Sequence, residues 1–275
     1  MYDFQNQIGF PILTVLTFLP ALGGLAILFL RGKPNAYKGV TLAVTGVNFL
    51  LSLVMIAYFD RYTADMQFIE KVPWIARLGI SYHLAVDGIS VLLIMLTALL
   101  SLIIVPASWN YIKEREMQFF AAFLFLETGL IGVFCARDLF MFYVFWEIML
   151  IPMYFIIGIW GGPRRIYAAV KFFLFTFAGS LLMLLAIVAI AYLARPNAYA
   201  TPVFDMDLLE KAVFSYQVKF FAFLAFLIAF AGQLLMWPLP NWLPVSHGQA
   251  PPARPSTPAG ATPKFCGSGT GRTVA

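Results

Sequence analysis

The chain has few charged residues for its length. Asp, Glu, Lys and Arg make up only 11% of its 275 residues, whereas 61% are hydrophobic and the mean hydropathy is +0.85. Ordinary soluble domains carry about 25% charged residues. A chain of this composition cannot cover its apolar surface with polar groups in water, which argues against a soluble domain. We predict a polytopic integral membrane protein.

Residues that bind metals and cofactors are also scarce. Cys135 and Cys266 are the only cysteines and lack a CxxC spacing, and His83 and His247 are the only histidines. A structural metal site needs about four ligands at close spacing. The sequence also contains no GxGxxG, P-loop or HExxH pattern,. We expect no nucleotide, flavin or metal site in this chain, and we interpret Cys135 as a small apolar residue at a helix end.

Seven apolar stretches are long enough to cross a bilayer, which takes about 20 residues of helix. They predict an all-α, polytopic transmembrane helical bundle of about seven membrane spans within residues 1–237. Residues 238–275 contain eight prolines and no apolar run of this length, so we expect a disordered tail there,. The predicted spans cover residues 9–30, 40–59, 87–108, 117–135, 139–160, 166–194 and 217–237.

Two longer connections are predicted outside the membrane. In residues 60–86, Pro73-Trp74 and the run 80–86 indicate a small surface hairpin. Residues 195–216 carry two prolines and several acids and are interpreted as a second loop.

Positive charge is scattered through short loops and does not form a run that could follow a nucleic-acid backbone,. We therefore expect no nucleic-acid partner. Basic residues do follow the first span, at Arg31, Lys33 and Lys38, and the fifth, at Arg164 and Arg165. The excess of Lys and Arg in cytoplasmic loops then predicts an N-terminus outside the cell.

Two acids interrupt the apolar stretches. A carboxylate at bilayer depth costs at least about 2.5–3.5 kcal/mol, so it persists where it faces other helices, meets a cation or water, or carries a proton. Glu147, in the fifth predicted span, is either a structural carboxyl hydrogen-bonded between helices or a group that titrates during transport, and we favour transport. Glu127, in the fourth, is either a proton-handling group or a helix–helix hydrogen-bond partner.

Three further features of the spans carry predictions. Lys171 lies about five residues inside the sixth span, where it either extends back to the membrane interface or approaches Glu147 from a neighbouring helix,. Asp87 precedes the third span and is expected to cap its first turn. Gly179-Ser180 is a small-residue patch that allows close helix approach.

The run FYVFWEIMLIPMYFIIGIWGG at 142–162 resembles the fifth helix of chain M of bacterial respiratory complex I, an antiporter-like membrane subunit of proton-pumping NADH–quinone oxidoreductase. Segments 86–90, 127–134 and 169–180 support the resemblance, which extends over about residues 1–237. It implies that the acid matching Glu147 pairs with a lysine on the seventh helix, and that a second lysine on the eighth helix passes the proton onward.

The sequence departs from this pattern near its end. Gln233 stands at the position of the seventh-helix lysine, and Val245 replaces an acid of the family's Trp-Leu-Pro-Asp-Ala-His segment. Lys264 falls at the second lysine's position, but the prolines around it prevent a helix. Because a glutamine cannot exchange a proton near neutral pH, we expect impaired pumping. The change suggests a frameshift, a sequence error or a degenerate gene copy.

The resemblance implies a multi-pass subunit of the bacterial inner membrane that contributes to redox-coupled proton translocation. Its partners would be the other membrane subunits of complex I and the lipid bilayer. NADH, FMN, iron–sulfur clusters and quinone would belong to partner subunits. Glu147, Glu127, Lys171 and Lys264 are the residues expected to serve proton transfer. Two alternatives are a subunit of a cation/proton antiporter or membrane hydrogenase, and a structural remnant that does not transport.

Overall fold

The computed structural model of the chain describes residues 3–5, 9–30, 34–197 and 199–233. The predicted tail at 238–275, which includes Lys264, Val245, His247 and Cys266, lies outside these residues.

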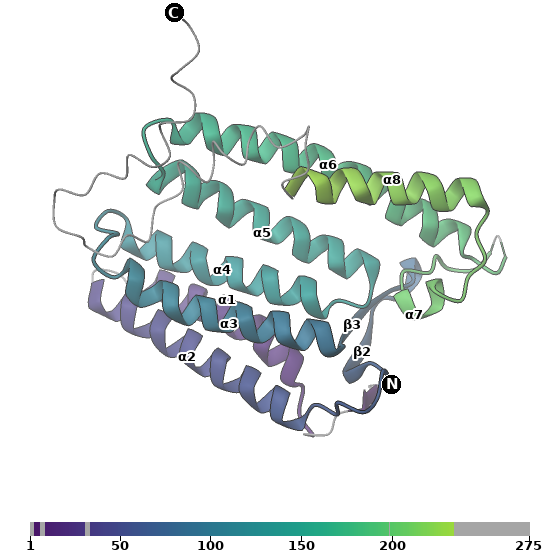
Figure 1. Cartoon of the computed structure of the whole chain (residues 1–275), viewed down its shortest axis with the longest axis horizontal. Coiled ribbons are helices and arrows are strands. Elements are labelled where there is room, and N and C mark those ends of the chain that lie inside the picture. The colour runs from purple at the N-terminus through teal and green to yellow at the C-terminus, as the bar shows by residue number, and fades with distance from the viewer. Residues whose placement is uncertain (1–2, 6–8, 31–33, 198, 234–275) are drawn as a thin grey trace, which may run out of the picture.

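The long helices run side by side along the longest axis of the molecule (Figure 1), and the described residues form seven of them. Six of them are long and apolar enough to cross a membrane, and a shorter apolar helix covers Tyr216–Ala231. The predicted helical bundle of about seven spans is therefore confirmed. The helices are α1 (Ile12–Phe29), α2 (Pro34–Tyr58), α3 (Gly88–Ser108), α4 (Glu116–Cys135), α5 (Leu139–Trp160), α6 (Arg165–Leu193) and α8 (Tyr216–Gln233).

The helix α2 begins earlier than the apolar run predicts, because polar residues extend it at the start. Its first residue is Pro34, not residue 40. Proline is well tolerated in the first turn of a helix, where its missing N–H would have no intrahelical partner. The prediction from hydropathy located the apolar part of this helix and missed its polar first turn.

A small antiparallel sheet lies at one end of the bundle (Figure 1), which we call the hairpin end. The predicted hairpin is present as β2 (Gln67–Ile75) and β3 (Ile80–Val86), joined by the short 3-10 helix η1 (Ala76–Leu78). A strand that the sequence did not predict, β1 (Asp3–Gln5), pairs with the outer edge of β2. The short helix α7 (Met206–Leu209), from the connection between α6 and α8, lies at the same end.

Gly79 fits the hairpin against the α6–α8 connection. Its φ of +69° is a conformation that residues with a side chain rarely adopt,. A Cβ added there would lie 1.9 Å from the carbonyl oxygen of Pro202. Both the turn and the close approach therefore require glycine.

Acidic side chains at the hairpin end cap three of the helices. Asp87 accepts a hydrogen bond from the Ser90 amide at 2.7 Å, which confirms the predicted cap of α3. Asp138 caps α5 in the same way. Glu70, on β2, accepts hydrogen bonds from the amides of Leu13 and Thr14 at 2.8 and 2.9 Å and so caps α1 from a distant part of the sequence. Free amides at a helix start favour a negative partner, so these acids fix the helix starts to the hairpin.

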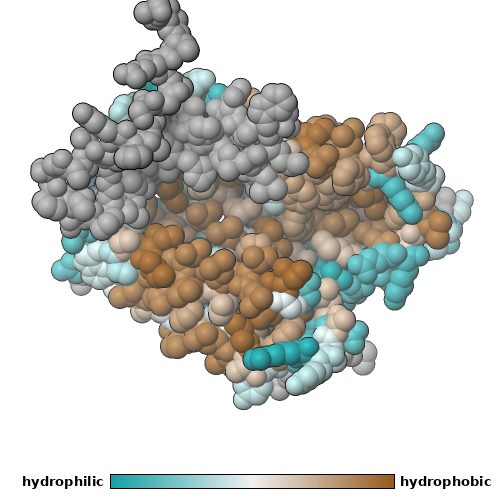
Figure 2. All heavy atoms as spheres, viewed as in Figure 1, coloured by the Kyte–Doolittle hydropathy of each residue, from teal (hydrophilic) through white to brown (hydrophobic). Residues whose placement is uncertain are grey.

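The outer surface of the bundle is largely apolar. In the space-filling view, hydrophobic residues (brown) cover the helices and hydrophilic residues (teal) gather at the ends (Figure 2). Exposed side chains such as Leu22, Leu50 and Leu185 belong to this surface. An apolar surface of this extent suits contact with lipid, which needs no polar cover.

Candidate functional site

Both intramembrane acids lie at the same depth in the bundle. Glu127 lies eight residues before Cys135, the last residue of α4, and Glu147 lies eight residues after Leu139, the first residue of α5. At 1.5 Å of rise per residue, each is about 12 Å along its helix from the hairpin end. They face different neighbours, because the α4 face at Gly129 packs against α5 whereas Glu127 points toward α2 and α3.

The Glu147 carboxyl lies between α5 and α6. Its neighbours are the hydroxyl of Tyr143, one turn earlier on α5, and through it the hydroxyl of Ser180 on α6. The Oε1 atom of Glu147 is buried and has no hydrogen-bond partner among the described residues. Within this part of the chain Glu147 also forms no ion pair. A buried carboxyl oxygen without a donor is costly, so this site lacks the partner that would complete it.

The helix α8 packs beside this site. Phe230 lies against Trp146 with ring centroids 5.3 Å apart, and a Cβ on Gly179 would lie 3.2 Å from the Cα of Ala229. The predicted close approach at Gly179 is thus confirmed. Gln233 is the last residue of α8, one turn after Ala229, but its side chain lies outside the described part of the chain.

The Glu127 carboxyl is 1% exposed and lies where three helices meet. Its Oε1 accepts a hydrogen bond from the Nδ2 of Asn48 on α2 at 2.8 Å, and Ser101 on α3 lies beside the same carboxyl. In the described part of the structure, Glu127 Oε2 and Asn48 Oδ1 have no hydrogen-bond partner. The site therefore offers two buried oxygens that a proton or a water molecule can join.

Lys171 lies apart from Glu147 along α6. It precedes Ser180 by nine residues, roughly 13 Å of helix,. Its Nζ is 5.7 Å from the centroid of the Tyr167 ring, one turn closer to the start of α6. The long side chain thus extends toward the start of α6, and its role in proton transfer stays a prediction.

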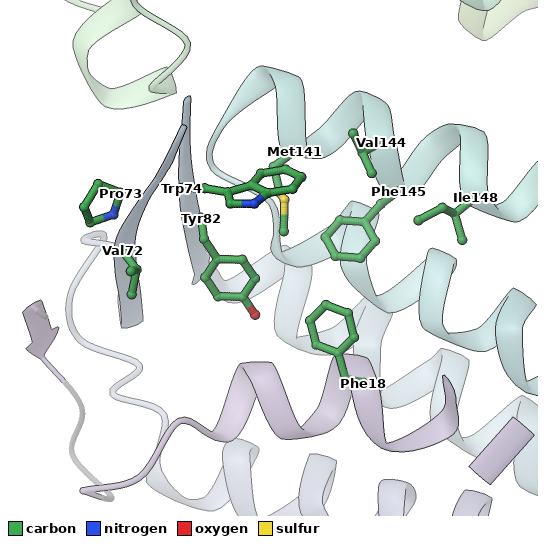
Figure 3. A pocket seen from close by; sticks show the side chains of 9 residues that line it. All are labelled: Phe18, Val72, Pro73, Trp74, Tyr82, Met141, Val144, Phe145 and Ile148. Atoms are coloured by element: carbon green, nitrogen blue, oxygen red, sulfur yellow. The ribbon is translucent and has the colours of Figure 1, made fainter. Parts of the chain in front are cut away.

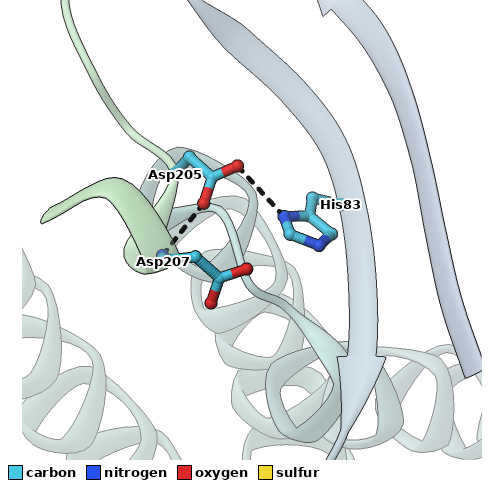
Figure 4. A group of neighbouring side chains, drawn as sticks. All are labelled: His83, Asp205 and Asp207. Carbon is cyan, nitrogen blue, oxygen red and sulfur yellow. Dashed lines mark hydrogen bonds and ion pairs between the residues drawn. The ribbon is translucent and has the colours of Figure 1, made fainter. Parts of the chain in front are cut away.

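Outside the membrane-spanning helices, an ionic cluster joins β3 to the α6–α8 connection. Figure 4 shows His83, Asp205 and Asp207 converging, with His83 Nδ1 3.3 Å from Asp205 Oδ2. Lys71 pairs with Asp205, and Arg137 pairs with Asp207. Burial alone would raise the pKa of Asp205, but hydrogen bonds and positive charge from His83 and Lys71 hold that pKa well below its usual range.

The same three side chains bring ligand atoms within 4.8 Å of one another, as a metal site would. The ammonium of Lys71 and the guanidinium of Arg137 already occupy the carboxylates and would repel a cation. The geometry is that of an ion-pair network that holds the loops together.

An apolar pocket of about 490 Å³ lies between the hairpin, α1 and α5 (Figure 3). Its lining offers apolar contact and no carboxyl, amine or imidazole, so it adds nothing to proton transfer. The lining residues are Phe18, Val72, Pro73, Trp74, Tyr82, Met141, Val144, Phe145 and Ile148.

Asn48 and Ser101 are neighbours of Glu127 that were not predicted from the sequence. Each interrupts an apolar run with one polar side chain, in a helix distant in sequence from α4. Asn48 follows Thr45 by three residues, and Thr45 follows Thr41 by four. This spacing was the available signal of a polar helix face.

Comparison with known proteins identifies the family. Residues 15–135 match the family described as NADH-ubiquinone oxidoreductase chain 4, amino terminus, and residues 136–261 match NADH:quinone oxidoreductase/Mrp antiporter, TM. NADH-quinone oxidoreductase subunit M of Rhodobacter capsulatus is 44% identical over 88% of this chain and 49% of its own length. NAD(P)H-quinone oxidoreductase chain 4 1 of Nostoc sp. is 37% identical over 90% of this chain and 45% of its own.

The fold also matches a chain in the structure of respiratory complex I from Thermus thermophilus with bound NADH. The TM-score is 0.76 at 29% identity, over 87% of this chain and 48% of that one. The chain thus spans about half the length of these relatives. The two adjoining family matches agree with the identity to subunit M and with the shared helical bundle. The chain therefore belongs to the NADH:quinone oxidoreductase/Mrp antiporter family, as an antiporter-like subunit of the M type.

Proposed function

We propose that the chain is a membrane subunit of an NADH–quinone oxidoreductase and contributes to redox-coupled proton translocation. The observation that carries this proposal is a pair of acids between apolar helices in a member of this family: Glu127 is buried, and Glu147 is partly buried with its Oε1 atom out of contact with solvent. Buried acids at bilayer depth are costly and mark ion or proton pathways.

The redox chemistry belongs to partner subunits in this proposal. NADH, FMN, iron–sulfur clusters and quinone would bind there, which fits the scarcity of cysteine and histidine in this chain,. The neighbours would be other membrane subunits and lipid, in the inner membrane of a bacterium, with the N-terminus and the hairpin end outside. The basic loops at the opposite end support this orientation.

Glu147 is the proposed switch group. Its Oε1 is buried without a described donor, while the hydroxyl of Tyr143 lies beside the carboxyl and connects it to Ser180 on α6. A nearby lysine would stabilise the charged carboxylate, and moving that lysine away would favour release of its proton. Gln233, at the end of α8, stands where the resemblance places this lysine and carries no charge, so we propose that pumping is impaired.

A chimera tests this function. Residues 15–233 of this chain would replace their counterparts in subunit M of Rhodobacter capsulatus, once as written and once with Gln233→Lys. Protons pumped per electron would be measured in membrane vesicles during NADH oxidation. We expect pumping to be impaired in the first chimera and restored in the second.

In the restored chimera, Glu147→Gln should abolish the gain, because an amide cannot carry the proton. The matched control is Glu210→Gln, which removes an exposed carboxylate outside the spans. An unchanged proton-to-electron ratio in the Glu147→Gln chimera would refute the proposed role. Loss of pumping in the Glu210→Gln chimera would show that any lost carboxylate has this effect.

A further inference from the structure

One face of α2 is polar and buried over most of its length. Thr41, Thr45, Asn48 and Ser52 are four, three and four residues apart, the spacing of one helix face, and all are 0% exposed,. Lys38 continues the same spacing into the first turn. Neighbouring helices enclose this face, where polar groups are costly unless they find partners.

At the middle of the bundle this face reaches Glu127. Asn48 donates to one carboxyl oxygen, which leaves Glu127 Oε2 and Asn48 Oδ1, both acceptors when the acid is ionised, without partners in the described structure. A proton on Glu127 turns one of these acceptors into a donor, and the Ser101 hydroxyl beside the carboxyl can accept from it,. The geometry is that of a carboxyl built to hold a proton.

The other end of the face carries a buried ion pair. Lys38 Nζ lies 3.2 Å from Glu116 Oε1, and their side chains are only 10% and 17% exposed. Glu116 Oε2 is buried and has no partner among the described residues. Both residues lie at the starts of their helices, so this pair marks the end of the bundle opposite the hairpin.

Thr41 and Thr45 bridge the interval between the ion pair and Glu127. Their hydroxyls donate to the carbonyls of Tyr37 and Thr41 at 2.7 and 2.9 Å, as threonines in helices often do,. The hydroxyl oxygens can still accept. Successive groups are about one turn, roughly 5.4 Å, apart, which one water molecule can span with two hydrogen bonds.

The route is closed toward the hairpin end. The polar face ends one turn beyond Asn48, at Ser52, whose hydroxyl donates to the carbonyl of Phe49. Beyond Ser52, the buried side chains of Met55, Ile94 and Ile131 belong to one apolar cluster. An apolar plug of this kind offers no step for a proton. The polar side chains of α2 therefore lead from Glu127 to the Lys38–Glu116 end of the bundle and stop short of the hairpin end.

We propose that Glu127 and Asn48 form a second proton-binding site, separate from Glu147, which exchanges its proton with the Lys38–Glu116 end along the polar face of α2. Glu127 carries the proton, and Asn48 is a positioning residue. Each transfer breaks one O–H bond and forms another through water, so no co-reactant is needed. The use of this site in pumping rests on the proposed function, but its existence and sidedness do not.

The groups facing the site favour this assignment. At the carboxyl itself, α2 and α3 contribute Asn48 and Ser101, which do not titrate. The helix α1 carries no charged residue, and the acid of α5, Glu147, faces α6 instead. Lys38 and Glu116 are the charged groups along the face.

Dicyclohexylcarbodiimide, an apolar reagent that adds to protonated carboxyls, tests the sidedness in the full chain. The chain would be reconstituted in liposomes of known orientation with the pH set independently on each side, and modification of Glu127 would be read by peptide mass spectrometry. Raising the pH by about two units at the Lys38–Glu116 end should lower the labelling at least about fivefold. The same change at the hairpin end should alter it less than about twofold.

Matched variants test the route. Thr45→Val removes one hydroxyl at nearly constant volume and should abolish the response, whereas Thr45→Ser should keep it. Thr97→Val is the control, because Thr97 makes the same backbone hydrogen bond away from the polar face. The proposal is overturned if labelling of Glu127 responds to the pH at the hairpin end, responds equally to the pH at both ends, or does not occur. This measurement uses the unmodified chain, so it does not depend on the folding of a variant. Failure of the Glu147 chimeras would leave it unaffected.

Discussion

Glu127 and Glu147 share a depth in the bundle but differ in their surroundings. Glu127 is enclosed by α2, α3 and α4, and Asn48 donates to it. Glu147 lies at the α5–α6 contact, with one buried oxygen unpartnered in the described structure. The first site is assembled within the first four helices, whereas the second faces the helices that continue toward Gln233. Each acid has one buried oxygen without a partner in the described structure, but Glu127 receives a hydrogen bond from a neighbouring helix, whereas the group beside Glu147 is a tyrosine hydroxyl of its own helix.

Filling the space at Gly132, where α4 packs closely against α5, should have the largest effect. A Cβ on Gly132 would lie 2.3 Å from the Phe145 ring, so Gly132→Ala forces α4 and α5 apart. We expect a loss of about 2–3 kcal/mol in the free energy of unfolding, from overpacking. Reversible unfolding in mixed micelles measures it.

The control for that variant is Gly39→Ala, where a Cβ meets nothing within 4 Å. It should be neutral or stabilising by up to about 1 kcal/mol, as alanine favours helix. Equal effects of the two substitutions would show that the α4–α5 contact is not tight at Gly132.

Asn48→Ala should destabilise the chain next most strongly. It leaves the buried Glu127 carboxyl without its donor from α2, at an expected cost of about 1–2 kcal/mol. The same unfolding measurement applies, with Thr97→Val as the control. A change below about 0.3 kcal/mol would argue against the Asn48–Glu127 hydrogen bond.

Glu147→Gln should change stability least among the intramembrane variants, by less than about 0.5 kcal/mol, because Glu147 is only partly buried and, in the described structure, receives no hydrogen bond from another helix,. The same substitution should nevertheless abolish pumping in the restored chimera, which separates a functional from a structural role. A large loss of stability would instead assign Glu147 a structural role.

Asp205 lies outside the membrane-spanning helices and should make stability depend on pH. The native pKa of Asp205 is depressed, so its contribution to stability is present above its unfolded pKa and is lost as pH falls through its native pKa,. Asp205→Asn should therefore lower the melting temperature by a few degrees at neutral pH, and the difference should shrink below about pH 4. A difference that is constant with pH would contradict the ion pairing with His83 and Lys71.

Local patterns predicted local structure well. The apolar runs located the helices, and the run 80–86 predicted β3. Asp87 caps α3 and Gly179 allows the close approach of α8, as their sequence neighbours indicated. Each of these depends on residues within one or two turns. Hydropathy alone missed the polar first turn of α2.

Features that depend on distant segments were not predictable in this way. Pairing of β1 with β2, capping of α1 by Glu70 and the approach of Asn48 to Glu127 all join segments more than 50 residues apart. The order of helices around the bundle decides such contacts, and similar apolar runs do not encode that order. Of the candidate residues, Lys264 lies outside the described chain, and the roles of Glu127, Glu147 and Lys171 stay predictions.

An experimental density map of the chain in lipid nanodiscs would show both the carboxyl groups and the lipid boundary. We expect the side chains of Glu127 and Glu147 to lie inside the hydrocarbon layer, each roughly 12 Å along its helix from the hairpin end and between neighbouring helices,. Either carboxyl lying in bulk solvent, or beyond the lipid layer, would contradict this placement.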